Sequence, residues 1–343
     1  MKRKDRLTPK REGRLTAIVI TREMTLLMAF AVLIFVFTVV LVSSLDDIRR
    51  MVYGVKPGVT LETRLISGYL PNEVRRIVEA MAEQERTAPK DAMIFKETGE
   101  LIPEAPGLDI DVDLTVDRSM KAKPGDNVEL ARTVIAPAIT KRHFSPVYRV
   151  DTGRQAMAIA VNVAWGEDCL PELLEIFREQ NVKATFFIDG EWAQKFPDMV
   201  MFISEEGHEL ANHGYQHVHV EKMSEPMIKQ LISDNEKLLV SLGVKPSKLF
   251  APPYGECNLT VVSAAASLGY TTTMWTIDTL DWKTEDPEKI LGRVVPKIAP
   301  GAIILAHPTK VFLKALPRIV DASRNAGYRF FTVSDLLNLH ESG

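Results

Sequence analysis

An uninterrupted apolar stretch is the first pattern along the chain. Residues 24–45 contain no charged residue, no glycine and no proline. A helix of that length rises about 33 Å, which is enough to cross a hydrocarbon core about 30 Å thick. Because no polar face interrupts the stretch, a membrane-spanning helix is favoured over a buried helix of a soluble domain. We therefore predict a transmembrane anchor over 24–45.

The charges on either side of this stretch predict its orientation. Residues 1–23 carry eight Lys or Arg side chains against three acidic ones, and Asp46-Asp47 follows the stretch. The positive-inside rule then places the basic tail in the cytoplasm and everything after the span outside. A cleaved signal peptide has an apolar core of only about 7–15 residues, and Val42-Ser-Ser44 is a poor cleavage site. We expect a single-pass protein of the cell membrane whose larger part is extracytoplasmic.

Residues 46–150 mix helical and extended patterns and form a predicted stalk of small α+β type. Apolar residues recur at helical spacing over 71–85. Short extended pieces broken by glycine and proline follow at 92–95, 101–102 and 108–116. The last piece carries acidic residues, which we interpret as a solvated strand face because a calcium loop needs a central glycine. They are Asp109, Asp111, Asp113 and Asp117.

From residue 157 onward, short apolar runs alternate with helical patterns. The expected strands are 157–163, 184–188, 209–212, 249–251, 271–277, 302–305 and 329–333. The expected helices are 171–180, 192–206, 225–242, 261–268 and 287–298. This alternation predicts an α/β fold with a parallel sheet. Because a complete (β/α)₈ barrel needs about 250 residues, we expect an irregular (β/α) barrel over 151–343.

Polar residues follow several of these strands, and histidine is prominent among them. His213 and His217 follow one strand, while His307 follows another. The carboxyl ends of parallel strands share one face, so these side chains should meet there. Two imidazoles four residues apart can share a zinc-sized ion, although an isolated pair is more often ordinary packing. The third histidine, with Asp281 available to orient it, makes a divalent metal site the better hypothesis.

Composition narrows the possible partners. The chain is 46% apolar and 25% charged, which is typical of a globular protein. Its net charge of −3 disfavours nucleic acid as a partner. Its two cysteines exclude a four-cysteine zinc site. Cys169 and Cys257 both follow motifs on the predicted active face, and three interpretations stay open: a disulfide, a soft metal ligand, or two unrelated thiols.

Two stretches give the region 155–338 a specific resemblance. Asn181-Val-Lys-Ala-Thr-Phe-Phe187 and Gly207-His-Glu-Leu-Ala-Asn-His213 resemble motifs of the NodB-type polysaccharide deacetylases, which are the family-four carbohydrate esterases. The resemblance implies a barrel of NodB type and hydrolysis of the carbon–nitrogen bond of N-acetyl groups on a glycan. The Ala164-Trp-Gly166 sequence is similar to the sporulation-associated YlxY-type branch.

The same resemblance assigns roles to individual residues. It implies a divalent metal, zinc by ligand type, on His213 and His217, and a general acid at His307 whose properties Asp281 tunes. The backbone N–H of Tyr254 would help to form the oxyanion hole. The substrate groove would include Pro253, Trp282 and Leu305.

Three positions depart from the family pattern. The family opens with Thr-Phe-Asp-Asp, whose first Asp is the general base and whose second is a metal ligand; here these positions are Asn162 and Val163. Ala251 stands where the family has an Arg that pairs with the base. An amide is no general base, and Val163 is no ligand, so we expect a weakly bound metal. Glu167 and Asp168 are possible substitutes, but capping of the following helix is the simpler interpretation.

The sequence therefore supports two functional hypotheses. The first is a membrane-anchored, divergent polysaccharide deacetylase acting on cell-wall glycan, in sporulation or envelope assembly. The alternative is a catalytically impaired protein of the same fold that binds peptidoglycan as a structural component. The middle region adds a weaker resemblance: Gly99-Glu-Leu-Ile-Pro-Glu104 and Gly107 resemble the peptidoglycan-binding domain of VanW-like surface proteins, while a plain spacer explains these residues equally well.

Overall fold

The computed structural model describes residues 21–95 and 97–341. Its contacts divide the chain into two compact units. The first contains the chain up to Thr87 together with Leu108–Val134, and the second contains Ala88–Gly107 together with the chain from Ile135 onward. The stretch 88–107, which the sequence pattern groups with the stalk, thus belongs to the carboxyl-terminal unit.

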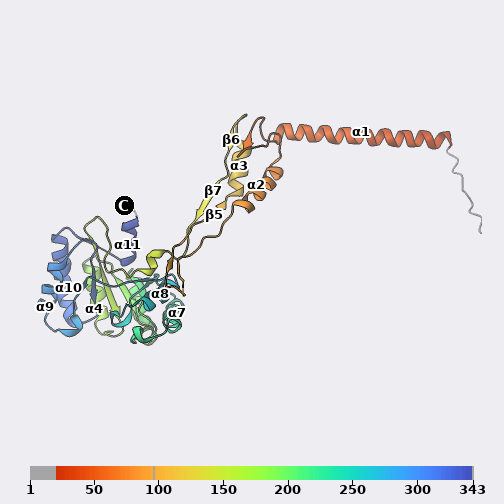
Figure 1. The fold of residues 1–343 in the computed structure, drawn as a ribbon. Helices are drawn as coiled ribbons and strands as arrows, with labels where there is room; N and C mark the ends of the chain where they lie inside the picture. The colour runs from red at the N-terminus through yellow and green to blue at the C-terminus, as the bar shows by residue number, and fades with distance from the viewer. Residues whose placement is uncertain (1–20, 96, 342–343) are drawn as a thin grey trace, which may run out of the picture. The chain divides into compact units, whose positions relative to one another are not determined.

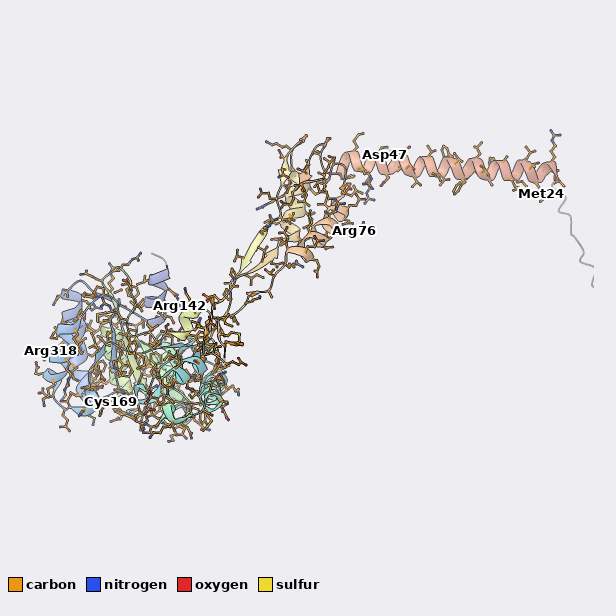
Figure 2. All side chains as sticks on the ribbon, viewed as in Figure 1. Met24, Asp47, Arg76, Arg142, Cys169 and Arg318 are labelled. Atoms are coloured by element: carbon orange, nitrogen blue, oxygen red, sulfur yellow. The ribbon has the colours of Figure 1, made fainter. Side chains whose placement is uncertain are left out.

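Helix α1 (Arg22–Tyr53) contains the predicted span. Its most apolar window has a mean hydropathy of 3.0, and none of its residues is buried. Figure 2 shows its side chains projecting outward along the helix between Met24 and Asp47. By length and composition this helix can cross a membrane, and a signal sequence passes the same test. Arg50, near its end, donates to both carboxylate oxygens of Glu73 at 2.8 and 2.9 Å.

The first unit is small and of α+β type, as predicted. A three-stranded sheet comprises β1 (Thr60–Leu61), β2 (Arg64–Leu65) and β6 (Asn127–Val128). Helix α2 (Pro71–Glu85) coincides with the predicted helix, and α3 (Val112–Lys121) packs against it. The short strands β3 (Met93–Ile94) and β4 (Leu101–Ile102) form a pair within the second unit. A further pair consists of β5 (Gly107–Ile110) and β7 (Arg132–Ile135).

The predicted acidic strand over 108–116 is wrong beyond its first residues. The strand ends at Ile110, and Asp111 caps the following helix by accepting a hydrogen bond from the Leu114 N–H at 2.8 Å. Aspartate is among the preferred residues at such a cap, because its carboxylate satisfies a free backbone donor. Asp113 and Asp117 therefore lie on α3 rather than on a strand face.

The second unit is built on an eight-stranded parallel sheet, which confirms the irregular barrel of NodB type. Its order is β12-β11-β10-β9-β8-β14-β13, and β15 also pairs with β8. The strands are β8 (Ala156–Val163), β9 (Thr185–Ile188), β10 (Glu209–Asn212), β11 (Leu249–Phe250), β12 (Thr271–Thr272), β13 (Ile277–Asp278), β14 (Ile303–Ala306) and β15 (Arg329–Phe331). The helices are α4 (Leu170–Glu179), α5 (Gly190–Lys195), α6 (Pro197–Glu205), α7 (Glu225–Ser241), α8 (Leu259–Ala266), α9 (Pro287–Val294), α10 (Lys310–Asn325) and α11 (Val333–Glu341), several of which Figure 1 shows around the strands.

Strand β8 shows how this sheet is buried on both faces. Its alternate residues are small, and Ala156, Ala158 and Ala160 pack with residues of neighbouring strands in the inner cluster. The residues between them, from Met157 to Val163, join the larger cluster formed with the helices. A parallel strand covered on both sides is apolar throughout, which explains why this run was recognisable from sequence.

Two expected elements differ in the structure, and two observed helices were not expected. The helix predicted over 192–206 is two helices, α5 and α6, because Pro197 begins the second. The strand predicted over 271–277 is divided into β12 and β13, which lie at opposite ends of the sheet order. Helices α10 and α11 were not predicted.

The backbone of Gly301 lies too close to that of Val150 to leave room for a side chain. Its φ is +73°, and a Cβ there would lie 1.5 Å from the Val150 carbonyl oxygen. We predict that Gly301→Ala lowers the free energy of unfolding by about 2 kcal/mol or more. All four tryptophans lie between Trp165 and Trp282, so urea unfolding followed by their fluorescence reports on this unit.

The control is Gly292→Ala in helix α9. This glycine has no neighbour that a Cβ would meet and no positive φ. Alanine should stabilise the helix there by up to about 1 kcal/mol. Equal unfolding midpoints for the two variants would contradict the proposed steric constraint on Gly301 from the Val150 backbone.

Candidate active site

One pocket lies at the carboxyl ends of the barrel strands, and it gathers most of the predicted site residues. Its volume is about 460 Å³. Its lining comprises Asn162, Ala164, Trp165, His213, His217, Tyr254, Gly255, Trp275, Asp278, Trp282, Leu305 and His307. The structure thus brings together residues from five segments that lie far apart in the sequence. We refer to this cavity as the histidine pocket.

His213 and His217 occupy the same wall of the histidine pocket. Their ring centroids are 5.2 Å apart. The Nδ1 of His213 lies 2.7 Å from the Ala251 carbonyl oxygen, so it carries the proton and leaves Nε2 as the free lone pair. Burial lowers the pKa of His213 to about 3 and also lowers the pKa of His217. Both imidazoles are therefore neutral near pH 7, the state in which they act as metal ligands.

His307 is held on the opposite side by a buried carboxylate. Its Nδ1 lies 2.9 Å from Asp281 Oδ1, and its backbone N–H donates to Oδ2 at 2.8 Å. Thr279 and Thr309 donate to the same carboxylate at 3.0 Å each. Four hydrogen bonds thus fix Asp281, which is 2% exposed. The dyad presents the other ring nitrogen of His307 as a proton carrier, which is the arrangement a general acid needs.

Tyr254 projects beside the histidine pair from a strained turn. Its φ is +59°, an uncommon value for a residue with a side chain. Its ring packs edge-on against His217 and stacks on His219, with centroids 4.4 and 4.3 Å apart. Glu256 lies 2.6 Å from the Nδ1 of His219 and holds that ring in place. The turn orients both the backbone and the ring of Tyr254, while Pro253 is buried beside it and does not line the pocket.

Asn162 and Val163 lie on opposite faces of β8. Asn162 lines the histidine pocket, is 6% exposed, and its Oδ1 has no hydrogen-bond partner within the described chain. Val163 is fully buried in the cluster between the sheet and the helices. Ala251 is buried in the inner cluster. The side chains of Asn162, Val163 and Ala251 can neither act as a base nor carry a charge.

The possible substitutes do not line the histidine pocket. Glu167 lines a neighbouring cavity. Asp168 is 68% exposed and lies 3.9 Å from the Lys310 ammonium group. Both cysteines are free, and Cys169 is buried at the start of α4, so the disulfide interpretation is not supported.

The donor set tests whether the histidine pocket fits a divalent metal. Catalytic zinc sites commonly have three protein ligands. His213 and His217 provide two, and across residues 21–95 and 97–341 no three His, Cys, Asp or Glu side chains form a group that could hold a metal. The residues present therefore make an incomplete metal site.

Several lining residues were missed by the sequence prediction. Trp165 stacks on His307 with ring centroids 5.7 Å apart. It was not named as a site residue, although it lies just after the predicted strand 157–163. Trp275 comes from the run 271–277 that was predicted as one continuous strand, and Asp278 follows that run directly. Asp189 follows the predicted strand 184–188 and is 3% exposed, and burial raises its pKa to about 6. The rule that found the histidines, polar residues after strands, also points to Asp189.

His208, in contrast, is a residue of the core. Its Nδ1 accepts a hydrogen bond from the Ala184 N–H at 3.1 Å, and its ring packs edge-on against Phe177 and Phe186. Burial lowers its pKa to about 4.

The two buried histidines predict acid sensitivity. The unfolded chain binds protons at His208 and His213 near pH 6.5, while the folded chain does not until pH 4 or below. Stability should therefore fall as the pH drops from 6.5 to 4, by about 3 kcal/mol for His208 alone. Asp189 opposes this trend, because a raised carboxyl pKa favours the folded state at low pH.

The measurement is urea unfolding followed by tryptophan fluorescence between pH 4 and 7. His208→Asn keeps an acceptor for the Ala184 N–H and removes the titrating ring. Its stability should be lower at pH 7 but should depend less steeply on pH than that of the parent. Parallel curves for parent and variant would refute the assignment to His208.

Comparison with known proteins identifies relatives of this arrangement. Residues 149–273 match the family model described as polysaccharide deacetylase. The Bacillus subtilis (strain 168) protein YlxY is 32% identical over 260 residues, which cover 75% of this chain and 81% of that protein. A peptidoglycan-N-acetylglucosamine deacetylase of Bacillus cereus is 32% identical over 196 residues, covering 55% of this chain and 92% of that enzyme.

Solved structures give the same result. A pseudoenzyme of carbohydrate esterase family 4 (CE4) from Bacillus anthracis aligns with a TM-score of 0.56 and 30% identity, covering 77% of this chain and 94% of that one. A mutant of that pseudoenzyme described as having restored enzymatic activity aligns with a TM-score of 0.55 and 29% identity, covering 77% of this chain and 97% of that one.

Proposed function

The chain belongs to the polysaccharide deacetylase family, and we propose that it is a divergent, catalytically impaired member that binds N-acetylated cell-wall glycan. The observation that carries this proposal is Asn162. It lines the histidine pocket at the position where the family has its general base, and its amide cannot accept a proton from water. Val163 deprives the same site of a metal ligand.

The rest of the histidine pocket is suited to an N-acetylated sugar. Trp165, Trp275 and Trp282 provide aromatic walls, and two of them are about half exposed. Flat aromatic surfaces of this kind, with a few convergent polar groups, are typical of small-molecule sites. Peptidoglycan is the proposed ligand because the Bacillus cereus relative is named as a deacetylase of its N-acetylglucosamine.

A slow deacetylase is the second candidate, and the His307–Asp281 dyad favours it. The dyad keeps a proton carrier at hydrogen-bond geometry although the base is lost. In this case His307 protonates the leaving amine and the Tyr254 N–H stabilises the oxyanion. A divalent metal bound weakly by His213 and His217 would supply Lewis-acid polarisation of the carbonyl.

We further propose that α1 anchors the protein in the cell membrane, with residues 1–23 in the cytoplasm and the chain after the span outside. The basic residues before the span support this orientation. The expected result is that a reporter enzyme fused after Gly343 is active only outside the cytoplasm. A matched fusion in which the basic residues before Met24 are replaced by Gln should lose this preference, and a cytoplasmic reporter in the parent would contradict the proposal.

Restoring the family residues tests the catalytic proposal. Asn162→Asp provides the base and Ala251→Arg its partner. Val163→Asp restores the family's third ligand position, which here faces the core, so its carboxylate has to turn out of the core to reach the two imidazoles. Each charge alone would be buried without a partner, which raises a carboxyl pKa and costs stability. We predict that the triple variant, with zinc, releases acetate from N-acetylglucosamine oligomers about 10²–10⁴ times faster than the parent. The restored activity described for the Bacillus anthracis pseudoenzyme supports this expectation.

Adding His307→Ala to the triple variant is the control, and it should abolish the gained activity. A parent as fast as the triple variant would overturn the proposed impairment and favour the second candidate. A folded triple variant that binds zinc and shows no activity would mean that the pocket is shaped for binding alone.

A further inference from the structure

A second cavity adjoins the histidine pocket within the carboxyl-terminal unit. Its volume is also about 460 Å³, within the range of small-molecule sites. It shares Ala164, Trp165 and His217 with the histidine pocket, so one extended ligand can reach both. We call this cavity the acidic pocket. Its remaining lining comprises Glu167, Asp189, Glu191, Trp192, Lys195, Phe196, Gln216 and Val218.

Two side chains that line the acidic pocket each carry a buried polar atom with no hydrogen-bond partner within the described chain. One is the acceptor Asp189 Oδ2, and the other is the donor Trp192 Nε1. Both side chains are 3% exposed. Folded proteins satisfy the great majority of such groups, and each one left unsatisfied costs about 1–3 kcal/mol. An unpaired acceptor and an unpaired donor in one cavity indicate a ligand that carries both functions.

The local fold fixes these two groups. Asp189 ends β9 and caps α5, where its Oδ1 accepts a hydrogen bond from the Trp192 backbone N–H at 3.0 Å. The bound oxygen cannot turn toward another donor without breaking the cap, so Oδ2 keeps its direction. Trp192 is anchored on the same short helix, and its ring packs against Phe196 with centroids 5.5 Å apart.

Charge distinguishes between the ligands that offer a donor and an acceptor. The lining carries three carboxylates, on Glu167, Asp189 and Glu191, against the single ammonium group of Lys195. This excess favours a cationic donor. An inorganic cation would leave the Trp192 N–H unsatisfied, because a metal ion accepts no hydrogen bond. An organic ammonium group with a neighbouring hydroxyl satisfies both requirements.

We propose that the acidic pocket binds a sugar unit with a free amine, a 2-amino-2-deoxyhexose, whose ammonium group pairs with Asp189 and whose adjacent hydroxyl accepts from Trp192. This inference rests on the proposed function, because the neighbouring unit of the same glycan then occupies the histidine pocket. The protein therefore recognises partially deacetylated glycan, with an acetylated unit beside a free amine. The unpaired carboxylate, whose pKa burial raises to about 6, gains its partner on binding.

The test compares three tetrasaccharides of β-1,4-linked glucosamine at pH 6.5: fully N-acetylated, mixed, and fully free-amine. Isothermal titration of the full chain in detergent measures each Kd. The mixed tetrasaccharide should bind about tenfold or more tightly than the acetylated one, since a hydrogen bond to a charged group is worth about that factor. Asp189→Asn, which keeps a capping side chain, should remove this preference, so that the variant binds the mixed and the acetylated tetrasaccharides alike.

Two further variants complete the design. Trp192→Phe keeps an aromatic ring and removes the N–H, so it should weaken binding of the mixed sugar. Asp286→Asn is the matched control, because Asp286 caps α9 through the Glu288 N–H at 3.0 Å and lines neither pocket. It should change no affinity.

The outcomes separate this inference from the proposed function. Acetylated sugar that binds as tightly as the mixed sugar overturns the inference alone. Affinities that neither Asp189→Asn nor Trp192→Phe alters also overturn it, because water then satisfies both atoms. If the acetylated sugar does not bind, while the mixed and free-amine sugars bind through Asp189, the proposed function fails and the inference stands. If none of the three sugars binds, both fail.

Discussion

The structure depends on the burial of strand β8 on both of its faces. This strand pairs with β9, β14 and β15, so the register of three neighbours is fixed through it. Its inner face carries small residues at Ala156, Ala158 and Ala160, which leaves the interior of the barrel to larger side chains such as Phe187. Hydrophobic burial on both sides is worth about 25 cal/mol for each Å² removed from water, and it explains why the strand is apolar from Ala156 to Val161. Asn162 is the first polar residue of this strand, and it lines the histidine pocket.

The site contains some of the residues of the family pattern and lacks others. The Asp281–His307 pair and the two neutral imidazoles come from loops after β13, β14 and β10, and they retain satisfied, well-positioned partners. The losses are confined to β8 and to Ala251 after β11. A base and its cationic partner stabilise each other only together, so losing both avoids a buried unpaired charge. Activity does not follow from the fold in such a family, because function resides in the site.

Much of this architecture could be predicted from the sequence, because buried parallel strands are continuous apolar runs. The strand over 209–212 and the helix over 71–85 were predicted with their observed bounds. The failures have physical causes that a periodicity argument does not contain. Asp111 turned an expected strand into a helix by capping it, and the run 271–277 divides because its two halves pair at opposite ends of the sheet. Most of the candidate residues were brought into one pocket, whereas the place of Trp165 in that pocket became visible only with His307 stacked beside it.

The two faces of β8 support the proposal that the pocket is a binding site. At Val163 the substituted side chain merges with the core, so that the position is now purely structural. At Asn162 the substituted side chain stays polar, and its buried carbonyl oxygen has no partner in the described chain. An apolar residue at this position would avoid that cost, as Val163 does one residue later. Retention of an unsatisfied acceptor beside aromatic walls is explained if a ligand donor, such as the N–H of an acetamido group, completes it. A pocket that stays polar without a base is therefore consistent with the proposed role in recognition.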